Sequence, residues 1–118
     1  LFEGEIVEAY SFFVNLFYMS KKEIIIVDNY ADEYLLGMLE KIKVPVIIYV
    51  GNNSKILKIE TKENIKVVTQ NVIHDRYVII DDDYIYHLGT SFNSFGKKRS
   101  SVHIENDITK EFLLRDLK

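Results

Sequence analysis

The chain has 118 residues and a net charge of −3, 47% of its residues are hydrophobic, and it contains no cysteine. These values exclude a disordered chain, a disulfide scaffold, a zinc–thiolate site and a thiol nucleophile, and no apolar run approaches the roughly 20 residues of a membrane span. The net negative charge also argues against a broad basic surface for nucleic acid, although a local basic patch is compatible with it.

The length fits one domain over residues 1–118. Because the sequence starts at Leu1, we expect it to be a fragment of a longer protein. The acidic start Leu1–Glu5 differs from a secretory signal, which begins with basic residues. Together with the lack of cysteine, this favours a cytoplasmic location.

The first half of the chain alternates between helical and strand-like patterns. Ile6, Tyr10, Phe13, Phe17 and Ser20 recur at helical spacing and predict an amphipathic helix over about Glu5–Ser20. Buried strands are predicted over Ile24–Val27, Val44–Val50 and Ile65–Thr69. A helix capped by Asp32 is predicted after the first strand, and a short helix from a Ser54 cap through Lys58 after the second. In this short helix, Ile56, Leu57 and Ile59 fit a strand equally well. This order predicts a parallel sheet with right-handed crossovers.

The second half has the pattern of a hairpin followed by a strand and a helix. Ile73–Ile80 and Tyr84–Leu88 are strand-like runs joined by Asp81-Asp82-Asp83, and Ser91–Ser100 is a polar loop or short helix. A further strand is predicted over Ser101–Glu105, and Asn106 or Asp107 is the predicted cap of a last helix ending at Leu117. The whole pattern predicts an α/β fold with a mixed, mostly parallel sheet, flanking helices and a hairpin toward the C-terminus.

Chemistry-bearing side chains concentrate on this hairpin. On a strand, residues two apart share a face, so His74 and Arg76 are expected on the same side. The return strand would bring Gly89, Thr90 and Asn93 to the same end of the sheet. A histidine can attack or protonate, an arginine neutralises charge through two hydrogen bonds, and hydroxyl and amide groups bind the remaining oxygens. Gly89 would let the backbone approach the ligand. The pattern therefore predicts a phosphate site.

Other polar residues have two interpretations each. Asp81 is expected to anchor the hairpin turn through local backbone bonds, and the Asp81–Asp83 run is expected to be solvated because its carboxylates point in different directions. His87 and His103 have no motif around them and are expected to be structural. Asp28-Asn29-Tyr30 either lines the site or forms a simple turn, and Lys97-Lys98-Arg99 either extends the phosphate site toward a polymer backbone or is a solvated loop.

The pattern His-x-Arg-x4-Asp followed by Gly-Thr-x-x-Asn, over residues 74–93, resembles the phospholipase D superfamily signature His-x-Lys-x4-Asp-x6-Gly-Ser-x-x-Asn. Three departures stand out. Arg76 replaces the family's lysine, Thr90 replaces its serine, and seven residues separate Asp81 from Gly89 where the family has six. Arginine and lysine are not interchangeable at a tuned site, so the change at position 76 bears directly on catalysis.

A longer stretch resembles the C-terminal region of phage and bacterial antirepressor-like proteins: residues 2–12, Ile24–Tyr30 and His74–Lys98, including the His-Asp-Arg variant. This resemblance implies that the chain is an accessory domain of a protein with an N-terminal DNA-binding domain, which is removed or absent here.

The superfamily resemblance implies a metal-free reaction without any cofactor, in which one histidine forms a phosphohistidine and a second protonates the leaving oxygen. His74, Arg76 and Asn93 would be catalytic, Arg76, Gly89, Thr90 and Asn93 would hold the phosphate, and Asp81 would support them. One motif per chain implies a homodimer with the site on its twofold axis. The expected function is a phosphodiester-binding domain of nuclease type; the alternative is an inactive oligomerisation or ligand-sensing module of a DNA-binding regulator.

Overall fold

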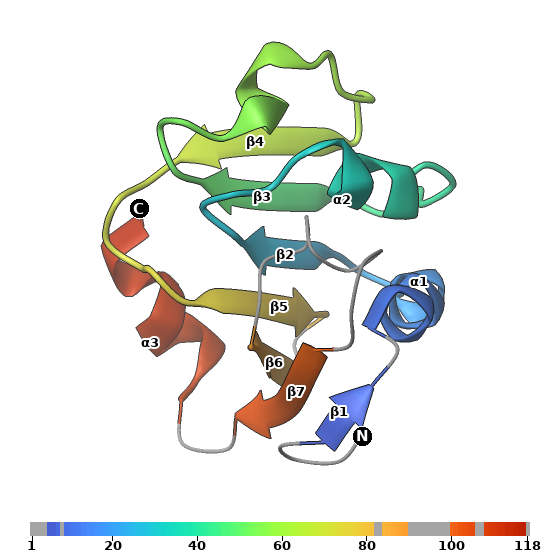
Figure 1. Ribbon diagram of the computed structural model, residues 1–118, viewed down its shortest axis with the longest axis vertical. Helices are drawn as coiled ribbons and strands as arrows, with labels where there is room; N and C mark the ends of the chain where they lie inside the picture. Colours follow the sequence, from blue (N-terminus) through green and yellow to red (C-terminus); the bar gives the residue numbers. More distant parts are fainter. Residues whose placement is uncertain (1–4, 8, 82–83, 90–99, 106–107, 118) are drawn as a thin grey trace.

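The computed structural model describes residues 5–7, 9–81, 84–89, 100–105 and 108–117 of the chain. They form one mixed sheet with the strand order β1-β7-β6-β5-β2-β3-β4 and helices on both of its faces (Figure 1). The elements are β1 (Glu5–Val7), α1 (Ala9–Met19), β2 (Ile24–Val27), α2 (Glu33–Met38), β3 (Val46–Val50), the 3₁₀ turn η1 (Lys55–Lys58), β4 (Ile65–Thr69), β5 (Arg76–Ile80), β6 (Tyr84–Leu88), β7 (Ser100–Glu105), α3 (Lys110–Leu114) and the 3₁₀ turn η3 (Arg115–Leu117).

The sheet has a parallel half and an antiparallel half. Strands β2, β3 and β4 pair in parallel, whereas β2–β5, β5–β6, β6–β7 and β7–β1 pair antiparallel. The α/β character and the mixed sheet are therefore confirmed, but the prediction of a mostly parallel sheet is wrong. Segment 70–75 is shorter than the dozen or so residues that a parallel crossover requires, so β5 enters beside β2 in the opposite direction.

Two cores cover the two faces of the sheet. On one face α1 and α2 bury Phe13, Phe17 and Leu35 against alternate residues of the strands, such as Ile26 and Val78. On the other face the intervening residues, such as Val27, Ile79 and Ile85, pack with Leu114 of α3. This period-two division is what a sheet covered on both sides requires.

The predicted first helix is wrong at its start. Residues Glu5–Val7 form the edge strand β1, which pairs with β7 from Glu5 opposite Val102 to Val7 opposite Ser100, and α1 begins at Ala9. Pairing with a distant strand thus overrides a pattern that is locally helical. The buried side chains of Phe13 and Phe17 confirm the amphipathic pattern farther along.

The predicted caps have mixed outcomes. Asp32 accepts a hydrogen bond from the Tyr34 N–H at the start of α2, and Ser54 does the same for Ile56 at the start of η1, as predicted. The last helix is capped by Thr109, whose hydroxyl oxygen accepts from the Phe112 N–H at 3.1 Å. The predicted caps Asn106 and Asp107 lie outside the described residues.

In the described part of the chain, no helix has the length and apolar character needed to cross a membrane.

Candidate functional site

The strand directions bring the motif to one edge of the sheet. The parallel strands β2, β3 and β4 all end at this edge, and β5 begins there because Tyr77 lies opposite Val27, the last residue of β2. Strand β6 ends there too, with Leu88 opposite Arg76. The carboxyl edge of β2 therefore gathers the start of the motif and Gly89. Ligands of open α/β sheets bind at such edges.

Arg76, the first residue of β5, is tied to the end of the hairpin. Its side chain is half-buried, and its Nη2 donates a hydrogen bond to the Gly89 carbonyl oxygen at 3.1 Å. The Nε atom is buried and has no hydrogen-bond partner among the residues that the structure describes. A buried N–H that lacks an acceptor is costly, and it is uncommon in a folded protein.

His74 lies on the segment before the strand. The prediction of a strand from Ile73 is wrong, because β5 begins at Arg76, so strand alternation does not extend to His74. The His74 side chain is exposed. The backbone groups just before His74 form hydrogen bonds with side chains instead of with a neighbouring strand. Gln70 Oε1 accepts from the N–H groups of Val72 and Ile73, both at 2.8 Å.

Asn29 completes this arrangement from the end of β2. Its Nδ2 donates to the Ile73 carbonyl at 3.3 Å, and its Oδ1 accepts from Gln70 Nε2 at 2.6 Å. Gln70 Nε2 also reaches the Ile73 carbonyl, at 2.8 Å. Asn29 therefore positions the segment that carries His74, a role that sequence analysis missed. Its neighbour Asp28 is buried and forms a local turn by accepting from the Tyr30 N–H. The location of polar residues at the strand end was the available signal.

Thr90 and Asn93, the two remaining predicted phosphate ligands, lie outside the described residues, as does the triplet Lys97-Lys98-Arg99. Their roles stay predictions. Of the predicted site residues, the structure describes His74, Arg76 and Gly89 at this edge, and Asn29 is hydrogen-bonded to the segment before His74.

Asp81 lies at the opposite end of β5 from Arg76 and anchors another part of the chain. Its carboxylate accepts hydrogen bonds from the backbone N–H groups of Lys21, Lys22 and Glu23, at 2.7 to 3.1 Å. These donors belong to the connection between α1 and β2, so Asp81 makes distant backbone bonds that the sequence did not predict, while the turn residues 82–83 of the expected local bonds lie outside the described residues. Asp81 has φ 55°, a left-handed conformation that aspartate tolerates better than most residues.

Histidines that looked structural form a cluster on the face opposite Arg76. His87 of β6 lies opposite His103 of β7, and Tyr77 of β5 lies opposite His87 on its other side. Glu105 is two residues from His103 on the same face. Burial raises the pKa of the Tyr77 hydroxyl, and the carboxylates of Asp75 and Glu105 raise it further. The cluster of Tyr77, His87, His103 and Glu105 therefore has two imidazoles close to acidic side chains.

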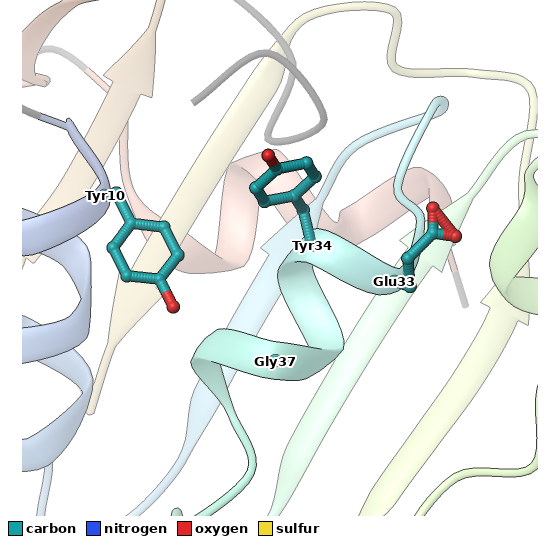
Figure 2. Close-up of a pocket in the computed structure, with 4 residues that line it drawn as sticks. All are labelled: Tyr10, Glu33, Tyr34 and Gly37. Atoms are coloured by element: carbon teal, nitrogen blue, oxygen red, sulfur yellow. The ribbon is translucent and has the colours of Figure 1, made fainter. Parts of the chain in front are cut away.

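A separate hollow of about 420 Å³ lies between α1 and α2 (Figure 2). Figure 2 shows Tyr10 extending from α1 toward α2, which contributes Tyr34, Glu33 and Gly37. No described residue of the motif lines it. The Glu33 carboxylate would repel a phosphate, so this hollow does not belong to the candidate phosphate site.

Comparison with known proteins supports the fold. No protein-family model and no curated protein matches the chain. The structure is similar to NucT from Helicobacter pylori, with a TM-score of 0.68 and 13% identity over 99% of this chain and 92% of that one. It is also similar to TrmBL2, an archaeal chromatin protein, with a TM-score of 0.57 and 12% identity over 90% of this chain and 45% of that one.

A weaker likeness is to phosphatidylserine synthase from Haemophilus influenzae Rd KW20, with a TM-score of 0.47 and 12% identity over 89% of this chain and 33% of that one. Identities this low show the fold alone. The likeness to NucT spans almost the whole of both chains and shows that the two proteins share a fold.

Proposed function

We propose that this chain is a phospholipase D-like domain that binds a phosphodiester at the carboxyl edge of β2. The observation that carries the proposal is the state of Arg76. Its guanidinium is held at this edge by the Gly89 carbonyl, while the buried Nε has no acceptor in the described part of the chain. A phosphate oxygen would supply that acceptor, and a guanidinium binds phosphate through paired charge-assisted hydrogen bonds.

His74 is two residues from Arg76 in the sequence and exposed, and in this proposal its ring contacts the bound phosphodiester. The predicted ligands Thr90 and Asn93 would complete the site. The fold likeness to NucT supports the proposal, and so does the likeness to TrmBL2, whose structure is described as showing a novel mode of DNA binding. A nucleic-acid backbone is therefore the phosphodiester that we propose.

The catalytic form of the proposal follows the superfamily resemblance. His74 would attack phosphorus, so that an N–P bond forms and a P–O bond breaks, and a second histidine would protonate the leaving oxygen. Water would then cleave the phosphohistidine and restore His74. Because each chain carries one motif, the second histidine would be the His74 of a twofold partner.

One observation favours the alternative, an inactive module that senses a ligand or mediates oligomerisation for a DNA-binding regulator. A histidine nucleophile is normally oriented by a further group, yet no carboxylate among the described residues lies in hydrogen-bond contact with His74. Arg76 in place of the family's lysine points the same way. In this form the edge binds a phosphodiester without cleaving it.

The experiment measures binding and turnover on the same variants. A fluorescent oligonucleotide reports binding, and hydrolysis of a generic phosphodiester in EDTA reports turnover. Arg76→Ala should weaken binding and lower the salt dependence of log K by about one phosphate contact. Lys66→Ala, which removes an exposed cation on β4, is the matched control. It should leave both the binding affinity and its salt dependence nearly unchanged.

Turnover distinguishes the two forms. If the site is catalytic, His74→Ala abolishes hydrolysis, Arg76→Ala lowers it by roughly 10²–10³, and Arg76→Lys retains it. If the module is inactive, no variant and no wild-type sample shows hydrolysis, while Arg76→Ala still weakens binding. Equal binding by wild type and Arg76→Ala would overturn both forms. Hydrolysis that requires Mg²⁺ would show that the assignment of the reaction to His74 is wrong.

A further inference from the structure

The two histidines and the glutamate on the α3 face of the sheet have the arrangement of metal ligands. His87 Nδ1 lies 3.2 Å from His103 Nε2, and the same His103 nitrogen lies 3.0 Å from Glu105 Oε1. One ligand atom of each residue lies within 4.8 Å of the others. We propose that His87, His103 and Glu105 form a binding site for a divalent transition metal of the Zn²⁺ type.

The spacing of these atoms matches the edge of a zinc coordination shell. Zinc binds imidazole nitrogen and carboxylate oxygen at about 2.0–2.2 Å, so two ligands of a tetrahedral ion lie about 3.3–3.5 Å apart. The ligand atoms of His87 and Glu105 lie within 4.8 Å of each other, and these two side chains would move toward each other to bind an ion. They come from the paired strands β6 and β7, where the register fixes His87 opposite His103.

Without an ion, hydrogen bonding joins all three groups only if a single N–H is shared between two acceptors. A ring nitrogen carries either a proton or a lone pair. His103 Nε2 therefore does not donate to Glu105 and accept from His87 at the same time, although both atoms lie in hydrogen-bond range. A cation that takes the lone pair of each nitrogen is attracted to both imidazoles and to the carboxylate together.

A carboxylate also lies near the second nitrogen of His87. Asp75 Oδ2 is 3.7 Å from His87 Nε2, the nitrogen that faces away from His103, which is outside hydrogen-bond range. Metal-bound histidines in other proteins commonly have a carboxylate hydrogen-bonded to the second nitrogen, and a small side-chain movement would bring Asp75 to that position. The Tyr77 ring, 5.1 Å from the His87 ring between centroids, packs against the imidazole and limits its rotation.

Burial is compatible with an ion that also keeps water. The side chains of His87, His103 and Glu105 are 25%, 26% and 22% exposed. They are fixed by the sheet but reachable from solvent. Two histidines and one carboxylate, with a coordination position left for water, are a ligand set that zinc uses. Imidazole ligands favour Zn²⁺ over Mg²⁺, which prefers oxygen ligands and its own water shell.

Because Arg76 lies on the other face, this site is separate from the proposed phosphodiester site. The chain contains three histidines, and His74 is the one outside the cluster. His74→Ala is therefore a matched control for a loss of metal affinity, and Arg76→Ala tests whether the two sites are independent.

The experiment titrates metal-free protein with Zn²⁺ by calorimetry and with Co²⁺ by visible absorption, and follows melting with Zn²⁺ and with Mg²⁺. We expect one Zn²⁺ per chain, a melting temperature raised by Zn²⁺ but not by Mg²⁺, and ligand-field bands with Co²⁺. His103→Ala and Glu105→Gln should weaken binding by more than about 100-fold, and Asp75→Ala by about 10-fold. His74→Ala and Arg76→Ala should bind as wild type does.

The proposal is overturned if wild-type protein binds no Zn²⁺ at 100-fold excess over protein, or if His103→Ala binds it as well as wild type. Loss of Zn²⁺ binding in His74→Ala but not in His103→Ala would place the metal elsewhere and overturn it as well. Glu105→Gln keeps the size of the side chain and a hydrogen-bonding oxygen, so it tests the site even if His103→Ala does not fold.

Discussion

Asp81 offers the sharpest test of how the hairpin is joined to the rest of the fold. Its buried carboxylate accepts four hydrogen bonds, two from the Lys21 N–H and one each from Lys22 and Glu23. Its own N–H donates to the Glu23 carbonyl at 2.9 Å. These bonds join the end of β5 to the connection between α1 and β2, and so tie the two halves of the sheet together.

Removal of the carboxylate should cost several of these bonds. A hydrogen bond to a charged group contributes about 1.5–3 kcal/mol, but the three donors share one acceptor group and water reaches part of the connection when it is gone. We therefore expect Asp81→Ala to lower the free energy of unfolding by about 2–4 kcal/mol. Asp81→Asn keeps one acceptor oxygen and should cost about half as much. At roughly 3–5 °C per kcal/mol for a chain of this size, the alanine variant should melt about 6–20 °C lower.

The pH dependence identifies the charge as the cause. Burial would raise the pKa of Asp81, but the N–H groups of Lys22, Glu23 and Lys21, together with the charge of Lys22, outweigh it and lower the pKa below its ordinary value. The stabilisation is therefore complete above the pKa of the unfolded chain and is lost as the pH falls through the lowered pKa. The stability difference between wild type and Asp81→Asn should shrink as the pH falls below about 4.

The assay is urea denaturation of wild type, Asp81→Asn, Asp81→Ala and the control Glu63→Ala, from neutral pH down to about pH 3. The control removes one exposed carboxylate and the same formal charge. If Asp81→Ala and Glu63→Ala have equal midpoints at neutral pH, or if the Asp81→Asn difference does not depend on pH, the carboxylate does not anchor the hairpin and our reasoning is refuted.

Three further perturbations test the core, a loop and the candidate site. Phe17→Ala empties a fully buried position under α1 and should cost about 3–5 kcal/mol in urea denaturation; a loss below about 1 kcal/mol would contradict the packing. Lys62→Met removes hydrogen bonds from Nζ to three carbonyls after α2 and should cost about 1 kcal/mol, unlike the exposed Lys66→Met, which should leave the urea midpoint unchanged. Asn29→Ala releases the segment before His74 and should weaken phosphodiester binding several-fold in the fluorescence assay. Equal affinities of wild type and Asn29→Ala would refute this role of Asn29.

The sequence predicted the parallel half of the sheet well, because its elements are local and strongly patterned. The runs Ile24–Val27 and Ile65–Thr69 match β2 and β4, and Asp32 and Ser54 cap the helical turns as their side chains lead one to expect. A continuous apolar strand between capped helices has few alternative structures.

The predictions failed where distant residues decide the local structure. The helical pattern near Glu5 does not reveal that β7 lies ready to pair with residues 5–7. The run from Ile73 has a strand-like pattern, yet the side chains of Asn29 and Gln70 form hydrogen bonds with its backbone, and β5 begins only at Arg76. The cap at Thr109 likewise moved the last helix past the predicted start. In the first two cases tertiary contacts outweigh local propensity, whereas the Thr109 cap is itself a local hydrogen bond.

The candidate site shows the same limit. The motif predicts a site over residues 74–93 but not the contacts that hold its described part, because these contacts come from three other strands or their ends. Asn29 after β2 and Gln70 after β4 fix the backbone before His74, and Gly89 after β6 holds Arg76. Asp75 lies 3.7 Å from His87 on the opposite face. Residues 74–76 thus face two chemically different environments within three positions. In the two proposals, His74 and Arg76 belong to the phosphodiester site, whereas Asp75 lies beside the metal site. Binding at either place should therefore respond to the conformation of this short segment, and Asn29→Ala, which loosens the segment without removing a charge, is the substitution that would reveal such a dependence.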